Sequence, residues 1–497
     1  MQGQIVRRVV IAGGGTAGWV VAAALGRLLG PLLDIVLVES DEIGTIGVGE
    51  STIPTARTFH HLLAIDEREF MRDTQSSFKL GIAFESWGAI GDRYIHSFGQ
   101  IGKSTWMGDF QHLWLQARAA GYAGDIGDYC FELQAAEAGK FATSDNATIN
   151  YAYHLDASAY ARFLRRVSET LGVKRREGKI TGVAQHAETG FIEALILESG
   201  DRVEGDLFID CTGFRGLLIE QTLKAGYEDW THWLPTDSGL AVQTGSVGPA
   251  IPYTRAIAHD SGWQWRIPLQ HRVGNGLVYC SEYLSDDEAR ARLLAQIEGE
   301  VLIEPRLIRY RTGRRRKVWD RNCIAFGLSS GFVEPLESTS IHLIMIGATR
   351  LAQLFPFSGC NEALAERYNA LARKELEGIR DFIILHYKLT ERDDSPFWRR
   401  CREMEIPESL ASRIALFRDN ALAWQDADDL FRVDSWVQVM LGQRLEPRAF
   451  HRMGELMQPE QLRKALNDLK SNIANAVARM PSHQSFLADY CAAPGAG

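Results

Sequence analysis

The sequence predicts an α/β fold, in which a Rossmann-type body precedes a mainly helical lobe, on three observations. Residues 8–39 read as a strand, a glycine turn, a helix and a second strand. Short apolar strands separated by turn residues recur between residues 180 and 327, and the chain beyond residue 361 is almost entirely helical in pattern. A helix that joins two parallel strands is the building unit of open α/β sheets, so this class accounts for all three observations.

The first of these observations is a βαβ unit. We predict a buried strand at Arg8–Ala12, a helix from about Thr16 to Leu29 and a second strand at Asp34–Glu39. The strands are runs of branched apolar residues and the helix is apolar on most of its surface, as expected of elements buried in a parallel sheet. In this order of elements, the turn between the first strand and the helix is the ligand-binding loop.

The turn carries Gly13, Gly15 and Gly18 in G-x-G-x-x-G spacing. These glycines allow a tight turn, a close approach of the backbone to a pyrophosphate and close packing of the helix on the strand. The amides of Thr16 and Ala17 at the helix start would then face the phosphates. The pattern favours a nucleotide site over a plain glycine-rich turn.

An acidic residue and a second loop extend this signature. Glu39 ends the second strand 21 residues after Gly18, where a carboxylate can accept hydrogen bonds from an adenosine ribose. The following loop is rich in glycine and includes Gly49, Glu50 and Ser51. Its irregular backbone leaves amides available to wrap a cofactor, and a surface turn is the alternative.

Lys79 is unusual because Phe78 and Leu80 flank it. Lysine is seldom placed among apolar residues without a partner. A catalytic amine is one interpretation, and a side chain that snorkels to solvent is the more common one. The residue type alone therefore leaves the role of Lys79 open.

A strand in the middle of the chain is predicted to return to the nucleotide-binding body. Residues 89–150 read as a loop-rich excursion that either lines a pocket or is packed irregular structure. A helix from Asp156 to Leu171 and a meander of short strands follow. The meander ends at Asp210, with Gly213 close behind, and flavoproteins use such a strand to cover their cofactor. Both residues are therefore predicted at the cofactor site.

The turn around Pro335 is a second candidate site. Pro335 stops regular structure, and Ser338 and Thr339 are good N-cap residues for an apolar helix of about Ile341–Phe355. Unpaired amides at a helix start can hold an anion. Glu337 on the same turn is either a capping acid or a functional carboxylate.

Local signals predict the remaining elements. Ser285 and Glu288 form an S-x-x-E capping box for a helix to about Glu298. Apolar runs predict strands near Leu307–Thr312 and Cys323–Gly327. The last third is predicted to be helical at Glu362–Tyr387, before Asp419, through SWVQVMLGQ and from about Pro459 to Met480.

Composition excludes several functional classes. The 497 residues are 45% hydrophobic with a formal net charge of −9, which gives no basic footprint for nucleic acid. Seven cysteines without C-x-x-C spacing argue against a metal site or a disulfide framework and favour a reducing cytoplasm. The uncharged run from Val9 to Gly26 fits the βαβ unit better than a signal peptide or a membrane span, so no membrane partner is expected.

Five motifs give the chain a resemblance to the flavin-dependent halogenases of the tryptophan-halogenase family, over nearly its whole length. They are G-x-G-x-x-G at 13–18, GVGESTIP at 47–54, FKLG at 78–81, W-x-W-x-I-P at 263–268 and EPLEST at 334–339. Each motif alone is modest, but all five occur in the order found in the family. The resemblance is therefore specific.

The resemblance implies a fold and a domain division. The body would be an FAD-binding, glutathione-reductase-like flavoprotein monooxygenase fold over residues 1–360. Interlocked segments at about 80–200 and 220–310 would line the substrate pocket. Residues 361–497 would form the helical C-terminal lobe.

The resemblance also implies a reaction. A separate NAD(P)H-dependent flavin reductase supplies reduced FAD (FADH2), which with O2 and chloride or bromide gives hypohalous acid. The oxidant travels inside the protein to a second cavity, where a small, electron-rich aromatic substrate is halogenated. A homodimer is compatible with the sequence.

Residue roles follow from the same resemblance. Lys79 would engage the oxidant, as a hydrogen-bond donor or as a haloamine, and Glu337 would stabilise the arenium intermediate or accept its proton. The halide would rest on the amides of Thr339 and Ser340, with Leu336 at the flavin. Many relatives have glycine where Ser340 stands, which leaves the preference for chloride or bromide open.

Trp263 and Trp265 alternate with Gln264 and Arg266, so on a strand the two indoles share one face. Two indoles on one face are usually core residues. The resemblance instead implies that this pair forms a barrier, which keeps the organic substrate away from the flavin.

The substrate is predicted to be an indole or a similar electron-rich arene, and not free tryptophan. His96 and Phe98 match positions that flank the indole ring in tryptophan-specific members. Those members also carry a late, tyrosine-rich segment with a glutamate that grips the amino-acid group. This sequence has no tyrosine between Met440 and Lys470.

Two other functions share the nucleotide-binding fold. An FAD-dependent aromatic monooxygenase would hydroxylate its substrate and reduce its own flavin with NAD(P)H, and it would need neither Lys79 nor Glu337. A non-catalytic flavin-binding protein would act as a sensor or carrier.

Overall fold

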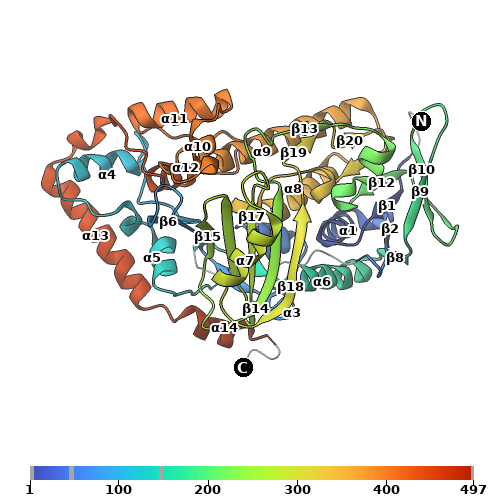
Figure 1. The fold of residues 1–497 in the computed structure, drawn as a ribbon, viewed down its shortest axis with the longest axis horizontal. Helices are drawn as coiled ribbons and strands as arrows, with labels where there is room; N and C mark the ends of the chain where they lie inside the picture. The colour runs from blue at the N-terminus through green and yellow to red at the C-terminus, as the bar shows by residue number, and fades with distance from the viewer. Residues whose placement is uncertain (1–4, 44–49, 145–148, 494–497) are drawn as a thin grey trace. The chain divides into compact units, whose positions relative to one another are not determined.

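The structure, a computed structural model, describes residues 5–43, 50–144 and 149–493 (Figure 1). The chain divides into two compact units, each assembled from three stretches that are separate in sequence. Unit 1 contains residues 1–76, 155–237 and 309–377. Unit 2 contains residues 77–154, 238–308 and 378–497. The expected domain division into residues 1–360 and 361–497 stays a prediction.

Unit 1 is centred on a six-stranded sheet in the order β20-β21-β12-β1-β2-β8. Parallel pairs join β1 to β2 and β12, β2 to β8, and β12 to β21, while β20 is antiparallel to β21. These strands are β1 (Arg8–Ala12), β2 (Asp34–Glu39), β8 (Lys174–Glu177), β12 (Leu207–Asp210), β20 (Trp319–Asp320) and β21 (Cys323–Ala325).

Helix α1 (Thr16–Leu29) connects the parallel strands β1 and β2. All three elements have the bounds that the sequence predicted, so the βαβ unit is confirmed. Helix α1 packs against α6 (Ala157–Thr170) and α8 (Ser340–Gln353), which explains why its sequence is apolar on most sides. The turn before α1 is thereby fixed by buried elements.

Smaller elements complete unit 1. An antiparallel meander in the order β11-β10-β9 packs its apolar side chains with Phe208 and Leu218 in one core cluster. A second three-stranded sheet has the order β13-β19-β22. The additional elements are α2 (Thr55–Leu62), α3 (Glu67–Asp73), β9 (Ile180–Gln185), β10 (Ile192–Leu197), β11 (Arg202–Glu204), β13 (Tyr227–Asp229), β19 (Gly313–Arg315) and β22 (Gly331–Phe332).

Unit 2 is centred on a seven-stranded sheet in the order β18-β14-β17-β16-β15-β5-β6. Helix α7 (Asp286–Gln296) lies over β14 and β17 (Figure 1), where Leu240, Leu277 and Leu293 share a core cluster. The strands are β5 (Gly81–Glu85), β6 (Arg93–Ser97), β14 (Ser238–Gly245), β15 (Thr254–Ala258), β16 (Gly262–Pro268), β17 (Arg272–Tyr279) and β18 (Val301–Arg309). Strand β4 (Ser77–Lys79), which pairs antiparallel with β7 (Ala152–Leu155), carries the predicted lysine.

The last third of the chain is helical, as the sequence predicted. Helix α9 (Glu362–Lys388) begins in unit 1 and ends in unit 2. The helices after it are α10 (Pro396–Glu403), α11 (Glu408–Asn420), α12 (Val433–Gly442), α13 (Pro459–Ala478) and α14 (His483–Cys491). The capping box of Ser285 and Glu288 at the start of α7 is also present.

Two sequence expectations were wrong. The strand expected near Leu307–Thr312 is β18, which starts at Val301 and runs through Pro305. Proline is tolerated there because β18 is an edge strand, and an edge strand need not donate every amide. The region expected to be loop-rich contains α4 (Phe110–Ala119) and α5 (Phe131–Glu137). The aromatic and histidine content of α4 hid its helical period, and α5 has only 7 residues.

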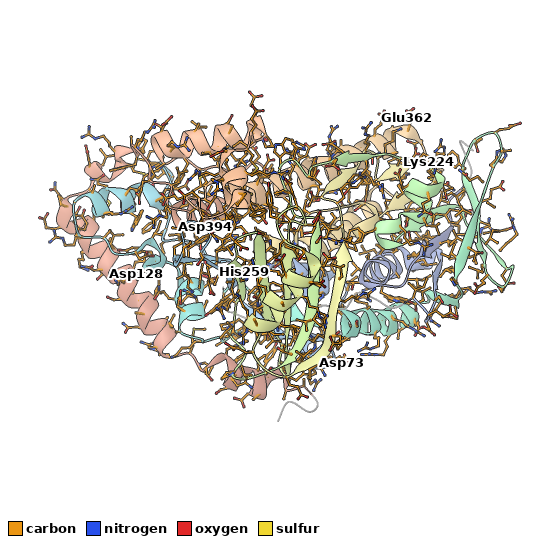
Figure 2. All side chains as sticks on the ribbon, viewed as in Figure 1. Asp73, Asp128, Lys224, His259, Glu362 and Asp394 are labelled. Atoms are coloured by element: carbon orange, nitrogen blue, oxygen red, sulfur yellow. The ribbon has the colours of Figure 1, made fainter. Side chains whose placement is uncertain are left out.

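Many charged residues lie on the surface. Asp73, Lys224 and Glu362, for example, are exposed (Figure 2). All seven cysteines are free thiols in this structure. In the part of the chain that the structure describes, every helix is too short or too polar to span a lipid bilayer.

Candidate active site

The glycine turn of unit 1 has the geometry that its spacing requires. Gly13 has φ +106°, and a Cβ there would lie 2.4 Å from the carbonyl oxygen of Cys211. A Cβ on Gly18 would lie 1.9 Å from the carbonyl oxygen of Gly13, because α1 packs closely on the end of β1. Neither position tolerates a side chain, since both obstacles are backbone atoms.

The turn is open at its tip, where a ligand could approach. Residues 13–17 are only partly buried, although β1 before them and most of α1 after them are buried. Gly15 is the N-cap of α1, and no side chain within the described ranges caps this helix start. The first-turn amides, with those of Thr16 and Ala17 among them, are therefore available to an anion.

Glu39 lies against the turn, as predicted. The ideal Cβ position of Gly14 is 1.5 Å from a carboxylate oxygen of Glu39, so the acid occupies the space beside the glycine. Glu39 Oε1 is 2.6 Å from the guanidinium of Arg175 on β8. Arg165 on α6 approaches the same oxygen at 3.7 Å. These ion pairs fix the carboxylate at the end of β2, next to the predicted ribose position.

Asp210 is a buried hub at the end of β12. Oδ1 accepts hydrogen bonds from the amide and hydroxyl of Thr212 and from the Ser329 hydroxyl, and Oδ2 accepts from the amides of Leu218 and Ile219. These five donors satisfy both carboxylate oxygens and hold the following turn. Gly213 begins that turn with φ +71°, and a Cβ there would meet open space.

The second predicted loop is described only in part. Gly49 lies outside the described residues. For Glu50 the backbone is described, as the first residue of the two-residue strand β3 (Glu50–Ser51). Ser51 is buried, with 9% of its surface exposed.

The turn before α8 brings the other unit 1 candidates together. Residues Pro335–Glu337 form a 3₁₀ turn in which Leu336 and Glu337 are buried, and Ser338 follows with φ +59°. This left-handed residue redirects the chain, so that Thr339 becomes the N-cap and Ser340 the first residue of α8. Thr339 is thus an N-cap residue, as the sequence suggested, although its side chain makes no capping hydrogen bond.

Thr339 has an unusual side chain. Its hydroxyl is fully buried, and within the described ranges it has no hydrogen-bond partner. Buried hydroxyls are normally paired, so this oxygen has an unmet hydrogen-bonding requirement. This hydroxyl and the first amides of α8 form a small group of hydrogen-bonding atoms inside a buried turn.

Lys79 is the central candidate in unit 2. It ends β4, none of its surface is exposed, and its Nζ lies 5.2 Å from the ring centroid of Phe98. That distance is within the range of a cation–π interaction. The structure thus brings Lys79 and Phe98 together and excludes snorkelling as the explanation for this lysine.

His96 lies on β6 and is buried against other aromatic rings. Its ring centroid is 5.4 Å from that of Phe382 on α9 and 6.3 Å from that of Phe431. Phe431 stacks on Phe382 at 3.7 Å. His96 therefore contributes to an aromatic wall in unit 2.

Trp263 and Trp265 share one face of β16, as predicted, with ring centroids 6.2 Å apart. Trp263 is also 6.2 Å from Trp87. The Trp265 ring covers Gly276 of β17, where a Cβ would lie 2.0 Å from it. The Trp265 indole N–H is buried and, among the described residues, has no acceptor.

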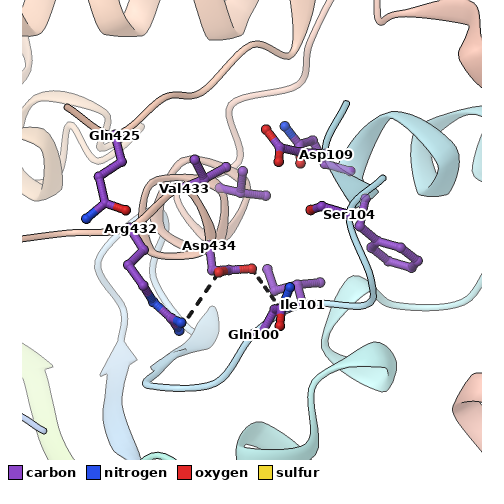
Figure 3. Close-up of a pocket in the computed structure, with 11 residues that line it drawn as sticks. Gln100, Ile101, Ser104, Asp109, Gln425, Arg432, Val433 and Asp434 are labelled. Carbon is purple, nitrogen blue, oxygen red and sulfur yellow. Dashed lines mark hydrogen bonds and ion pairs between the residues drawn. The ribbon is translucent and has the colours of Figure 1, made fainter. Parts of the chain in front are cut away.

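A cavity of about 190 Å³ lies beside the segment that follows Phe98 (Figure 3). Asp434 accepts the amide of Ile101 at 2.8 Å, and Arg432 donates to the carbonyl of Phe98 at 3.0 Å. Burial raises the pKa of Asp434. The sequence analysis missed this cavity, because its residues come from segments more than 300 positions apart.

The sequence model of the tryptophan halogenase family matches residues 8–459. The chain belongs to the tryptophan halogenase family. It is a flavin-dependent halogenase, an enzyme that depends on FADH2 and O2.

Relatives span the whole chain. The halogenase is 34% identical over 528 aligned residues to tryptophan 7-halogenase RebH of Lentzea aerocolonigenes, covering 98% of this chain and 99% of RebH. Among solved structures, Xcc4156, a flavin-dependent halogenase from Xanthomonas campestris, has a TM-score of 0.97 and 54% identity, with 99% of each chain covered. BrvH, a flavin-dependent halogenase from Brevundimonas sp. BAL3, has a TM-score of 0.94 and 44% identity, covering 98% of this chain and 99% of BrvH. The mixed α/β fold is therefore that of flavin-dependent halogenases.

Proposed function

We propose that this halogenase uses reduced FAD, O2 and chloride or bromide to halogenate an electron-rich arene such as an indole, and that free tryptophan is not its substrate. The observation that carries the proposal is the fully buried Lys79, which ends a short strand with Phe98 beside it. A buried amine has a high desolvation cost and persists where it has a function.

Unit 1 fits an FAD molecule. The open turn at residues 13–17 would take the pyrophosphate, and Glu39 would take the ribose. Gly213, where a Cβ would meet open space, would allow the cofactor to approach the end of β12 closely, with Ser51 and Leu336 as further contacts. When bound, reduced FAD supplies with O2 and halide the hypohalous acid that the reaction consumes. A separate flavin reductase would deliver it, as is typical of the family.

The start of α8 fits a halide. The amides of Thr339 and Ser340 point along the helix axis, and the buried Thr339 hydroxyl lacks a partner within the described ranges. A chloride or bromide ion would satisfy these donors. The Ser340 side chain, in place of a glycine, would narrow the site and set the preference between the two ions.

Lys79 would direct the oxidant. In the transfer ArH + HOX → ArX + H2O, the carbon–halogen bond forms and the halogen–oxygen bond breaks. The ammonium would donate a proton to the departing oxygen and so raise the electrophilicity of the halogen. In the other route, the neutral amine first exchanges a proton for the halogen and then passes the halogen to the arene.

Glu337 would complete the reaction. Its buried carboxylate, next to the left-handed Ser338, would stabilise the positive arenium ion and accept its proton. Trp263 and Trp265 would keep the arene away from the flavin, while His96 and Phe98 would line its pocket. The absence of a tyrosine between Met440 and Lys470 argues against recognition of an amino-acid group.

The test is a reconstituted reaction. We expect purified protein with FAD, a flavin reductase, NADH and bromide or chloride to halogenate indole, as measured by mass spectrometry with catalase present. Hydroxylated product alone, or reduction of bound FAD by NADH without the reductase, would identify an aromatic monooxygenase instead. Bound FAD without any product across an arene panel and both halides would identify a flavin carrier.

A further inference from the structure

Strand β4 places Lys79 in a defined neighbourhood within unit 2. It pairs antiparallel with β7, so that Ser77 lies opposite His154 and Lys79 lies opposite Ala152. Side chains alternate along a strand, so Ser77 and Lys79 share one face of this pair with His154 and Ala152. His154 is therefore the diagonal neighbour of Lys79, and both side chains are fully buried.

The hydrogen bonds of His154 determine its tautomer. The Ser77 hydroxyl is 2.6 Å from the carbonyl oxygen of Pro268, which can only accept, so the single Ser77 hydrogen points there. Nδ1 of His154 is 3.1 Å from the same hydroxyl and must donate to it. Nε2 then carries no hydrogen and accepts from the Thr254 hydroxyl at 2.9 Å. His154 is assigned as the neutral Nδ1–H form.

A second buried histidine holds the same strand from another side. Nδ1 of His483, on α14, is 2.6 Å from the carbonyl oxygen of Ala250 and must donate to it. Nε2 therefore accepts, and its donor is the backbone amide of Phe78 at 3.1 Å. The Phe78 ring stacks on Phe141 with centroids 4.0 Å apart. His483 is thus also a neutral Nδ1–H histidine. It accepts a hydrogen bond from the backbone amide of Phe78, the residue directly before Lys79.

The surroundings favour neutral rings. Burial lowers the pKa of His483 to about 4, and it lowers that of His154 well below its usual value. The charged and titratable groups that act on His154 are Lys79 from β4 and His483 from α14, and both lower its pKa further. From β15 and β16, the Thr254 hydroxyl and the Pro268 carbonyl face it. A proton on either ring would remove an accepting nitrogen and add a cation beside Lys79.

We propose that His154 and His483 are positioning residues, a neutral histidine clamp that fixes β4 and thereby aims Lys79. This inference rests on the proposed role of Lys79. His154 holds the strand through the side chain of Ser77, and His483 holds it through the main chain of Phe78. The carbonyl of Pro268, the last residue of the W-x-W-x-I-P motif, is the fixed point to which Ser77 and His154 are tied.

The first test is spectroscopic and needs no turnover. Protein with ring-labelled histidine is examined by ¹³C and ¹⁵N NMR, and the two signals are assigned by their loss in His154→Asn and His483→Asn. We expect both rings in the Nδ1–H form, with no titration between pH 8 and pH 5. An Nε2–H signal, or titration within that range, would overturn the clamp. This test does not measure activity. The clamp can therefore be disproved without disproving the proposed function, and the proposed function can fail while the clamp is confirmed.

The second test separates aim from stability. His154→Leu removes both hydrogen bonds, whereas His154→Asn keeps an N–H near the Nδ1 position. We expect His154→Leu to lower kcat for indole by up to ~10²-fold, because a misplaced catalytic group costs about that much. KM and FAD binding should be unchanged, trapped hypohalous acid should increase, and His154→Asn should recover part of the rate.

The matched control is His60→Asn in unit 1. His60 is also fully buried, and it is hydrogen-bonded to Tyr160 at 2.8 Å, but it is not part of the β4 segment. Its variant should lose stability while keeping the yield of product per FADH2. Equal loss of yield in the control and in His154→Leu would reduce the clamp to a structural role. Should His154→Leu not fold, Thr254→Val removes the donor to Nε2 alone and should give the same increase in trapped oxidant, to a smaller extent.

Discussion

The two units build their candidate sites from different parts of the chain. In unit 1 the carboxylates of Glu39 and Glu337 accompany candidates that act through the backbone, with Gly13 and Gly18 at positions where a Cβ would strike a carbonyl and with helix starts that no described side chain caps. In unit 2 they act through side chains, with Lys79 and Trp265 buried among aromatic residues. Backbone sites depend on spacing along the sequence, whereas side-chain sites depend on contacts between distant segments.

Loss of Lys79 should have the largest effect on activity. Lys79→Met preserves most of the volume and removes the amine, so halogenation should fall by about 10²–10⁴-fold, the usual contribution of a proton-transferring group. FAD binding in unit 1 should not change. The measurement is product per FADH2, with catalase present to remove peroxide.

The control for this variant is Lys388→Met. Lys388 is a partly buried lysine of unit 2 whose Nζ donates to the carbonyls of Arg402 and Met404 at 2.8 and 2.6 Å. It should retain full activity. An equal loss of product per FADH2 in both variants would mean that the effect is not specific to Lys79. The proposal that the Lys79 side chain acts in the reaction would then fail.

Acid should destabilise both units through buried histidines, of which His60 in unit 1 and His483 in unit 2 are examples. Burial lowers the pKa of His60 to about 3 and that of His483 to about 4, while the unfolded value is 6.5. The unfolded chain therefore binds protons first as the pH falls below about 6.5, and stability is lost down to the folded pKa. For His483 the loss is roughly 3 kcal/mol. Thermal unfolding from pH 7 to pH 4 should show it, and His60→Asn or His483→Asn should each flatten the dependence.

Gly18→Ala should disrupt the backbone site of unit 1. The new Cβ would lie 1.9 Å from the Gly13 carbonyl oxygen, so α1 must move away from β1. We expect a loss of roughly 1–3 kcal/mol, as for other overpacked interiors, together with loss of FAD binding. Gly182→Ala on β9 is the control, since its nearest contact is at 3.5 Å. Tight FAD binding by Gly18→Ala would contradict the proposed turn.

Ser340→Gly should have the smallest effect. Removing the side chain at the start of α8 leaves both amides in place and widens the proposed halide site. We expect the ratio of brominated to chlorinated product to change by about threefold to tenfold, which corresponds to about 1 kcal/mol. A competition experiment at equal halide concentrations measures it, and an unchanged ratio would remove Ser340 from the halide site.

Much of unit 1 could be predicted from the sequence because its elements obey local rules. The bounds of β1, α1 and β2 were predicted to the residue from apolar runs and glycine spacing. The ion pair of Glu39 with Arg175 could not be predicted, since the partners lie 136 positions apart. The same limit hid the hydrogen bond from the Ser329 hydroxyl to Asp210, whose partners lie 119 positions apart.

In unit 2 the sequence indicated some of the candidate residues but not the residues that contact them. Lys79 was visible as a lysine between apolar neighbours, but His154, 77 positions after its partner Ser77, carried no local signal. Helix α4 was missed because its aromatic content resembled irregular structure, and α5 was missed because its 7 residues are too few to show a clear helical period. The role of a buried histidine can be assigned only when the hydrogen-bond partners of both ring nitrogens are known.

The contact between Phe78 and His483 also bears on how the protein is made. The two residues are 405 positions apart. The hydrogen bond from the Phe78 amide can therefore form only after nearly the entire chain has been synthesised. The segment that carries the amine is therefore among the last to reach its final form during synthesis. A chain that stops short of residue 483 should emerge with that segment unfinished, however well the rest has folded.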